Sequence, residues 1–140
     1  MRRRGAVRLE ALVLVAVGRR GELAVDRLRE VARDLRAQRT DWLLGAPEFV
    51  DETDDTGIRT VGILHRLYAA YDEEGRPLDE SSDRRQFDET RAIVEALQVA
   101  SASARIDLGL ELDGGSVGWI EHGELTDSLR VGLLESWGAR

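Results

Sequence analysis

Two histidines are the side chains in this sequence best suited to acid–base chemistry near neutral pH. His65 lies among apolar neighbours, and Tyr68 and Asp72 follow it closely in the chain. In a pocket, the imidazole of His65 could act as a general base beside these two groups. The alternative is a core histidine with no catalytic role. His122 follows Glu121 at the expected end of a strand and is expected to lie in a surface loop. The catalytic candidates are therefore His65, Tyr68 and Asp72.

The chain lacks two residue types on which much enzyme chemistry depends. It contains no cysteine, and all 20 of its basic residues are arginine. This composition excludes disulfides, thiolate nucleophiles, zinc–thiolate sites, Schiff-base lysines and the lysine of a Walker loop. The sequence contains no G-x-G-x-x-G dinucleotide fingerprint either. We therefore expect no cofactor and favour a binding protein over an enzyme.

The acidic stretch Asp51–Gly57 is the best place to look for a calcium site. An EF-hand loop needs Gly at its sixth position and a bidentate Glu at its twelfth. A loop that starts at Glu52 places Ile63 at position 12, and one that starts at Asp51 places Thr56 where Gly is required. The two histidines also lack the spacing of a zinc motif. We therefore expect a solvated hairpin loop here and no bound metal.

The charge of the chain narrows the class of partner. The 140 residues carry a formal charge of −7, yet residues 1–20 contain six arginines and a single glutamate. The rest of the chain is strongly acidic, which disfavours nucleic acid as a partner unless Arg2–Arg4 acts as a binding arm. A basic protein partner suits such a surface. The length suits a single domain, 1–140, in which residues 1–6 form a flexible basic arm.

The N-terminal residues superficially resemble an export signal, because Arg2–Arg4 precede the apolar run Ala11–Val17. This run is short and is followed by Gly18–Arg20, without the small-residue cleavage site that export requires. It is also too short to span a membrane. We therefore expect a cytoplasmic protein that does not associate with a membrane, which agrees with the absence of cysteine.

The clearest single element is the stretch Arg105–Leu112. Its apolar positions alternate with polar ones: Ile106, Leu108, Leu110 and Leu112. This period of two predicts a strand with one buried face and with Arg105, Asp107 and Glu111 on a wet face. The Asp-Gly-Gly-Ser sequence at 113–116 then favours a tight hairpin into a second strand, Val117–Ile120.

Three further stretches are predicted as strands. Ala11–Val17 is apolar on both faces and rich in valine, which favours a central strand, with a helix as the alternative. Ile58–Tyr71 predicts a long strand rather than a helix, because Gly75 suits a bulged hairpin turn after it. Trp42–Val50 predicts a short, irregular strand that either lies at an edge of the sheet or bulges at Pro47, since Pro47 cannot donate a hydrogen bond to a neighbouring strand.

Helical periodicity marks three segments. Glu22–Arg39 carries an apolar stripe at helical spacing, with its charged residues on the other side. Ser81–Ala104 predicts a second helix, capped by Ser81 or Ser82. Thr126 is expected to cap a short third helix with three large apolar residues on one side: Leu129, Leu133 and Trp137.

The order of these elements predicts an α+β fold. We expect a ferredoxin-like (split β-α-β) sheet with an added C-terminal β-hairpin and short helix. Both faces of Ala11–Val17 are apolar, so the C-terminal helix or a second subunit must cover the second face. The expected binding or interface residues are Leu12, Leu14, Trp119, Leu133 and Trp137.

The fold class does not by itself assign a function. The favoured hypothesis is a non-enzymatic protein-interaction domain, either an accessory or assembly subunit or an acidic immunity-type inhibitor of a basic partner. Its partner would be another protein or further copies of this chain. One alternative is a small-ligand-binding protein or enzyme that uses the open sheet face around His65. Another is a structural subunit of a virus or other particle.

Overall fold

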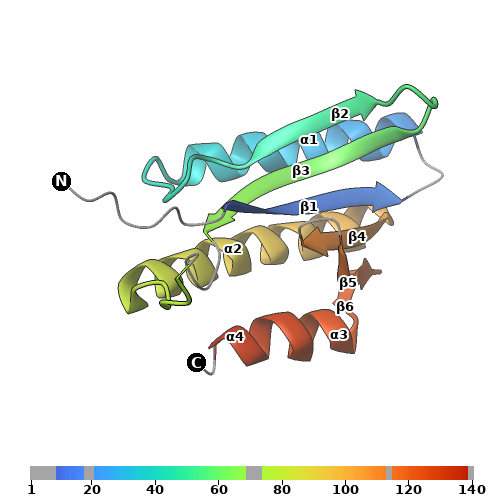
Figure 1. Ribbon diagram of the computed structural model, residues 1–140. Helices are drawn as coiled ribbons and strands as arrows, with labels where there is room; N and C mark the ends of the chain where they lie inside the picture. Colours follow the sequence, from blue (N-terminus) through green and yellow to red (C-terminus); the bar gives the residue numbers. More distant parts are fainter. Residues whose placement is uncertain (1–8, 18–20, 69–73, 113–114, 139–140) are drawn as a thin grey trace.

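The computed structural model describes residues 9–17, 21–68, 74–112 and 115–138, with side chains described from residue 25 onwards. It shows a mixed α+β protein in which helices pack on an antiparallel sheet (Figure 1). In chain order the elements are β1 (Leu9–Val17), α1 (Gly21–Gln38), β2 (Glu48–Thr53), β3 (Arg59–Tyr68), α2 (Glu80–Ala104), β4 (Asp107–Leu112), β5 (Gly115–Glu121), β6 (Glu124–Leu125), α3 (Asp127–Leu129) and α4 (Ser136–Gly138). A π-helical turn, Arg130–Glu135, joins the last two, and we call Asp127–Gly138 the C-terminal helical segment.

The sheet has six strands in the order β2-β3-β1-β4-β5-β6. All neighbouring strands are antiparallel. Strand β1 pairs with β3 on one side and with β4 on the other, which confirms that the apolar run Ala11–Val17 is a central strand. Strand β2 lies at an edge, as Pro47 immediately before it predicts.

The loop before β2 corrects the prediction of a strand over Trp42–Val50. Residues 42–47 precede the strand, and Trp42 is buried in the core. The indole Nε1 of Trp42 donates a hydrogen bond to the carbonyl of Arg39 at 3.1 Å. The backbone N–H of Leu43 donates to Glu89 on α2 at 3.0 Å. These bonds fix Trp42 and Leu43 against the end of α1 and against α2, in place of a strand partner.

Helix α1 buries the predicted stripe, from Val25 to Leu35, against β2, β3 and α2. Helix α2 begins one residue earlier than predicted, because its N-cap is Asp79 rather than Ser81 or Ser82. The Asp79 carboxylate accepts the backbone N–H of Ser82 at 3.0 Å. The next described helix or strand after β3 is α2, and the turn predicted to follow Ile58–Tyr71 falls partly on residues 69–73, which lie outside the described part of the chain.

The hairpin β4–β5 confirms most of the strongest sequence prediction. Ile106, Leu108 and Leu110 are fully buried, whereas Leu112 is only half-buried. The strand itself starts at Asp107, because Arg105 ends α2 in a left-handed conformation with φ 55°. Leu112 pairs with Gly115, so the two strands are antiparallel neighbours joined by residues 113–114, which lie outside the described part of the chain.

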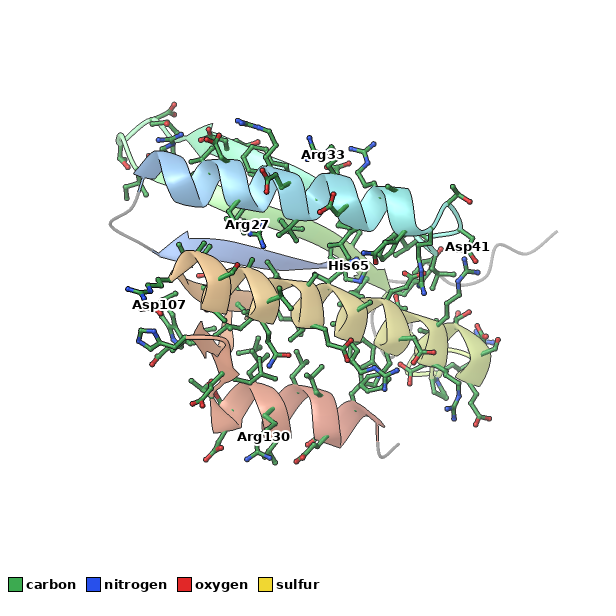
Figure 2. All side chains as sticks on the ribbon, turned by 180° about the vertical axis from the view of Figure 1, so that it is seen from behind. Arg27, Arg33, Asp41, His65, Asp107 and Arg130 are labelled. Carbon is green, nitrogen blue, oxygen red and sulfur yellow. The ribbon has the colours of Figure 1, made fainter. Side chains whose placement is uncertain are left out.

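The C-terminal helical segment packs on the same face of the sheet as α1 and α2. Leu129 is fully buried, and a Cβ added at Gly118 would lie 2.6 Å from the Cβ of Leu129. Gly118 pairs with Leu110, whose side chain is in the core, so Leu129 is also on the core face. Seen from behind, α1, α2 and the C-terminal segment form one helical layer in front of the sheet (Figure 2). This corrects the hypothesis that the C-terminal helix covers the second face of β1.

Candidate functional site

His65 lies in the core of the protein, at the centre of β3. Its side chain is 2% exposed, and its imidazole meets the indole of Trp42 edge-on at 6.3 Å between ring centroids. Neither ring nitrogen has a hydrogen-bond partner in the described part of the chain. Burial lowers the pKa of His65 to about 4, since a charged imidazolium would lose its hydration there. His65 is therefore a neutral core residue at neutral pH, with no hydrogen-bond partner among the described residues.

The structure places two of the three catalytic candidates, His65 and Tyr68, on opposite faces of the sheet. Successive strand residues point to opposite faces of the sheet, so Tyr68, three positions after His65, lies on the other face. Tyr68 is half-buried at the end of β3, and its backbone N–H donates to the side chain of Gln86. Asp72 lies outside the described residues. His122 is exposed in the turn between β5 and β6 with φ 52°, as a surface loop residue would be.

Residues 114–118 match the pattern Gly-x-Ser-x-Gly, which in α/β-hydrolases marks a nucleophilic serine. That motif needs a sharp turn from a strand into a helix, with the serine at its tip. Here Ser116 is an exposed residue within β5, in the second strand of a β-hairpin. Ser116 is therefore not at a turn from a strand into a helix, and the pattern does not indicate a hydrolase.

One buried carboxylate, Glu89, holds the loop before β2 onto α2. Its side chain is 1% exposed, and its Oε2 lies 3.5 Å from the Nε of Arg85 and 3.9 Å from the Nη1 of Arg39. Burial raises the pKa of Glu89. The hydrogen bond from the Leu43 N–H and the charges of the two guanidinium groups lower the pKa, but by less. These contacts join α2 to the residues that follow α1, so Glu89 fixes the position of the loop before β2.

A surface hollow of about 300 Å³ lies between α2 and α4. Trp137 forms part of its wall, packs edge-on against Phe87 at 5.5 Å and donates its indole N–H to Asp83 at 2.9 Å. The guanidinium of Arg91 sits over the Phe87 ring. Leu133 and Trp137, two expected interface residues, are thus half-buried against the core and serve to dock the C-terminal segment.

The opposite face of the sheet carries no helix in the described part of the chain, and we call it the open face (Figures 1 and 2). Strand register assigns alternate residues to it. One row crosses five strands through directly paired positions, which are Val50, Gly62, Val15, Gly109 and Trp119. We call this row the apolar band. Leu12 and Leu14 pair with His65 and Ile63, so they hold positions of the core face, and their side chains lie outside the described ones.

Trp119 is the largest side chain on the open face. It is 37% exposed, and its ring lies over Gly109, where an added Cβ would be 3.2 Å from the indole Cζ3. Thr126 fixes the backbone of Trp119, because its hydroxyl accepts the Trp119 N–H at 3.1 Å and its N–H donates to the Trp119 carbonyl at 3.0 Å. The backbone of Trp119 is therefore fixed by Thr126 and its indole packs on Gly109, as suits an interface anchor at the surface.

Acidic side chains border the apolar band on both sides. The described charged residues that register assigns to the open face are Glu48, Glu52, Arg66, Asp107, Glu111, Glu121 and Glu124. Arg66 pairs with Glu48 at 3.0 Å. Among the described residues, the other five acids have no ion-pair partner, unlike most acids of the helical layer. The open face is therefore apolar at its centre and negatively charged around it.

The described residues contain no group of three or more His, Asp or Glu side chains that could hold a metal ion. No helix in this part of the chain is both long and apolar enough to cross a membrane. Comparison with protein-family models, with curated proteins and with solved structures finds no match to this chain.

Proposed function

We propose that this chain is a non-enzymatic protein-interaction domain that binds a basic protein partner through the open face. It would act as an accessory or assembly subunit, or as an acidic inhibitor of that partner. The observation that carries the proposal is the apolar band, on the face that has no helix in the described part of the chain. At the two ends of the band, Trp119 is 37% exposed and Val50 is partly exposed. Apolar surface that is left wet forgoes about 25 cal/mol per Å², so these exposed apolar side chains indicate an interface.

The charge of the open face favours a different protein over a second copy of this chain. Two copies joined by this face in a symmetric dimer would bring acidic borders together. Like charges across an interface suppress association, whereas Arg or Lys of a partner would neutralise them. The same charge supports a protein partner over nucleic acid.

The finer description of the fold is part of the proposal. The order β2-β3-β1-β4, with both long helices on one face, supports a ferredoxin-like arrangement within a single domain. Strands β5 and β6 and the C-terminal helical segment would then be additions to it. The lack of cysteine supports a cytoplasmic location.

An enzyme that works around His65 has less support. That proposal needs an accessible imidazole with polar neighbours. His65 is buried, and neither ring nitrogen has a hydrogen-bond partner among the described residues.

A capture experiment with paired variants tests the proposal. Immobilised wild-type protein would be compared with Val50→Ser/Trp119→Ser on the open face and with Val99→Ser/Val131→Ser on the helical layer, where both valines are exposed. We expect a stoichiometric protein from native lysate on the wild type and on the helical-layer variant, and its loss from the open-face variant. Equal capture by all three proteins would overturn the proposal, provided that their melting curves show all three folded.

A further inference from the structure

We infer that the segment which binds the open face is a basic amphipathic α-helix that lies along the apolar band, across the strands. This inference rests on the proposed function and names the shape and chemistry of the partner. It follows from the dimensions of the band and from where the acids stand beside it.

The length of the apolar band matches a short helix. Val50 and Trp119 lie on β2 and β5, the first and last of five strands that the band crosses. Neighbouring strands are about 4.8 Å apart, so the band is roughly 19 Å long. A helix rises about 1.5 Å per residue, so roughly 13 residues would span it. An extended strand laid along the band would leave its backbone N–H and C=O groups without partners, because the apolar side chains of the band cannot form hydrogen bonds with them.

The width between the acids matches the diameter of a helix. On one side of the band stand Glu48 and Glu111, and on the other stand Glu52, Asp107 and Glu121. Glu48 and Glu52 are four residues apart on one strand, which separates the two acidic borders by roughly 13 Å. An α-helix with its side chains is about 10–12 Å across. Arg or Lys on both flanks of its apolar stripe would therefore reach acids on both sides.

Binding of a designed probe peptide tests this inference. The probe has about 14 residues, a Leu stripe at i, i+3, i+4 and i+7, and Arg on both flanks. A peptide of the same composition in scrambled order is its control. Fluorescence anisotropy measures binding to the full chain, and circular dichroism measures helix formed on binding. We expect the probe to bind and to gain helicity, and the scrambled peptide to bind about tenfold more weakly or less.

Two double variants with the same change in charge locate the site. Glu52→Arg/Glu121→Arg alters the borders of the band, and Asp34→Arg/Glu95→Arg alters exposed acids of α1 and α2 on the other side of the sheet. We expect the first to weaken probe binding about tenfold or more and the second by about twofold or less. Equal weakening by both variants would contradict the inference, because it would show non-specific attraction to an acidic protein.

Other occupants of the band give different results. Self-association that disappears in Glu52→Arg/Glu121→Arg would assign the face to a second copy. Probe binding that appears only after Arg2, Arg3 and Arg4 are replaced by serine would assign it to the chain's own arm. Either result overturns the inference. If the lysate partner depends on Trp119 while the probe does not bind, the helix inference fails and the proposed function stands.

Discussion

His65 shows how one buried side chain can set the response of the protein to pH. Its surroundings are apolar, and neither nitrogen has a partner in the described part of the chain, so nothing offsets the loss of hydration that a positive charge would suffer. This is why burial lowers its pKa from 6.5 to about 4. A residue that the sequence offers as a general base is, by its environment, kept neutral.

The depressed pKa predicts a loss of stability in mild acid. Above pH 6.5 His65 is neutral in both the folded and the unfolded chain. As the pH falls from 6.5 towards 4, the unfolded chain binds the proton and the folded protein does not, so the free energy of unfolding falls by about 3 kcal/mol. Below pH 4 both states bind it, and no further loss arises from His65.

Urea denaturation of wild type and His65→Leu at several pH values measures this effect. The difference in free energy of unfolding between the two proteins should change across pH 4–6.5 and stay constant above pH 7. Taking the difference cancels contributions that both proteins share, including that of Glu89, whose raised pKa acts in the opposite direction. A pH-independent difference would show that His65 is hydrated or paired.

At the scale of elements, two glycines test how the C-terminal helical segment docks. Gly118 has φ 149°, and an added Cβ would lie 2.6 Å from the Leu129 Cβ and 2.8 Å from the Thr126 Oγ1. Gly118→Ala should therefore destabilise the protein by about 2 kcal/mol or more. Gly132, within the π-helical turn, has nothing within 4 Å of its added Cβ. Gly132→Ala should be neutral or stabilising by up to about 1 kcal/mol. Thermal or urea unfolding of both variants checks the contrast, and equal effects would contradict this packing.

Removal of the same segment is predicted to be costly. Leu129 is fully buried, and Leu133 and Trp137 pack against the core from the side of α2. A chain that ends at Leu125 should lose at least the roughly 2–5 kcal/mol expected for Leu129 alone, and should expose apolar surface that binds a dye such as ANS. An unchanged melting temperature without dye binding would mean that the segment is not part of the core.

Helices and strands could be predicted from the sequence where the spacing of apolar side chains is enough to distinguish a helix from a strand. The alternation around Leu108 and the helical stripe around Leu28 each required one buried face, and each gave the right element. The loop at Trp42 was not predictable, because an apolar stretch of that composition resembles an edge strand until its tertiary partner, Glu89, is known. The N-cap of α2 was not predicted correctly, because Asp79, Ser81 and Ser82 can all cap a helix and lie within four residues of one another.

The candidate site was less accessible to sequence reasoning than the fold. Trp119 could be named as an interface residue from its type, but the apolar band depends on register among five strands far apart in the chain. The acids of its borders come from β2, β4 and β5, and in the sequence they look like ordinary solvated positions. The sequence does not show which element an apolar side chain packs against. For this reason Leu133 and Trp137 were predicted as interface residues, although both pack against the core of the same chain.

The whole molecule is one-sided. Its helices form a single layer on one face of the sheet (Figure 2), and within the described residues the other face carries no helix (Figure 1). The acids of the helical layer mostly pair with arginines three or four residues away, whereas five acids of the open face have no such partner among the described residues. This asymmetry of packing and of charge is the reason for assigning partner binding to the open face.

Site-specific photo-crosslinking tests that assignment most directly. A benzophenone amino acid would replace Trp119 on the open face in one protein and Val99, 62% exposed on α2, in a control protein. After illumination in native lysate, we predict a discrete crosslinked protein from position 119 and none from position 99. A crosslink from position 99 with none from position 119 would contradict the account, because the partner would then bind the helical layer.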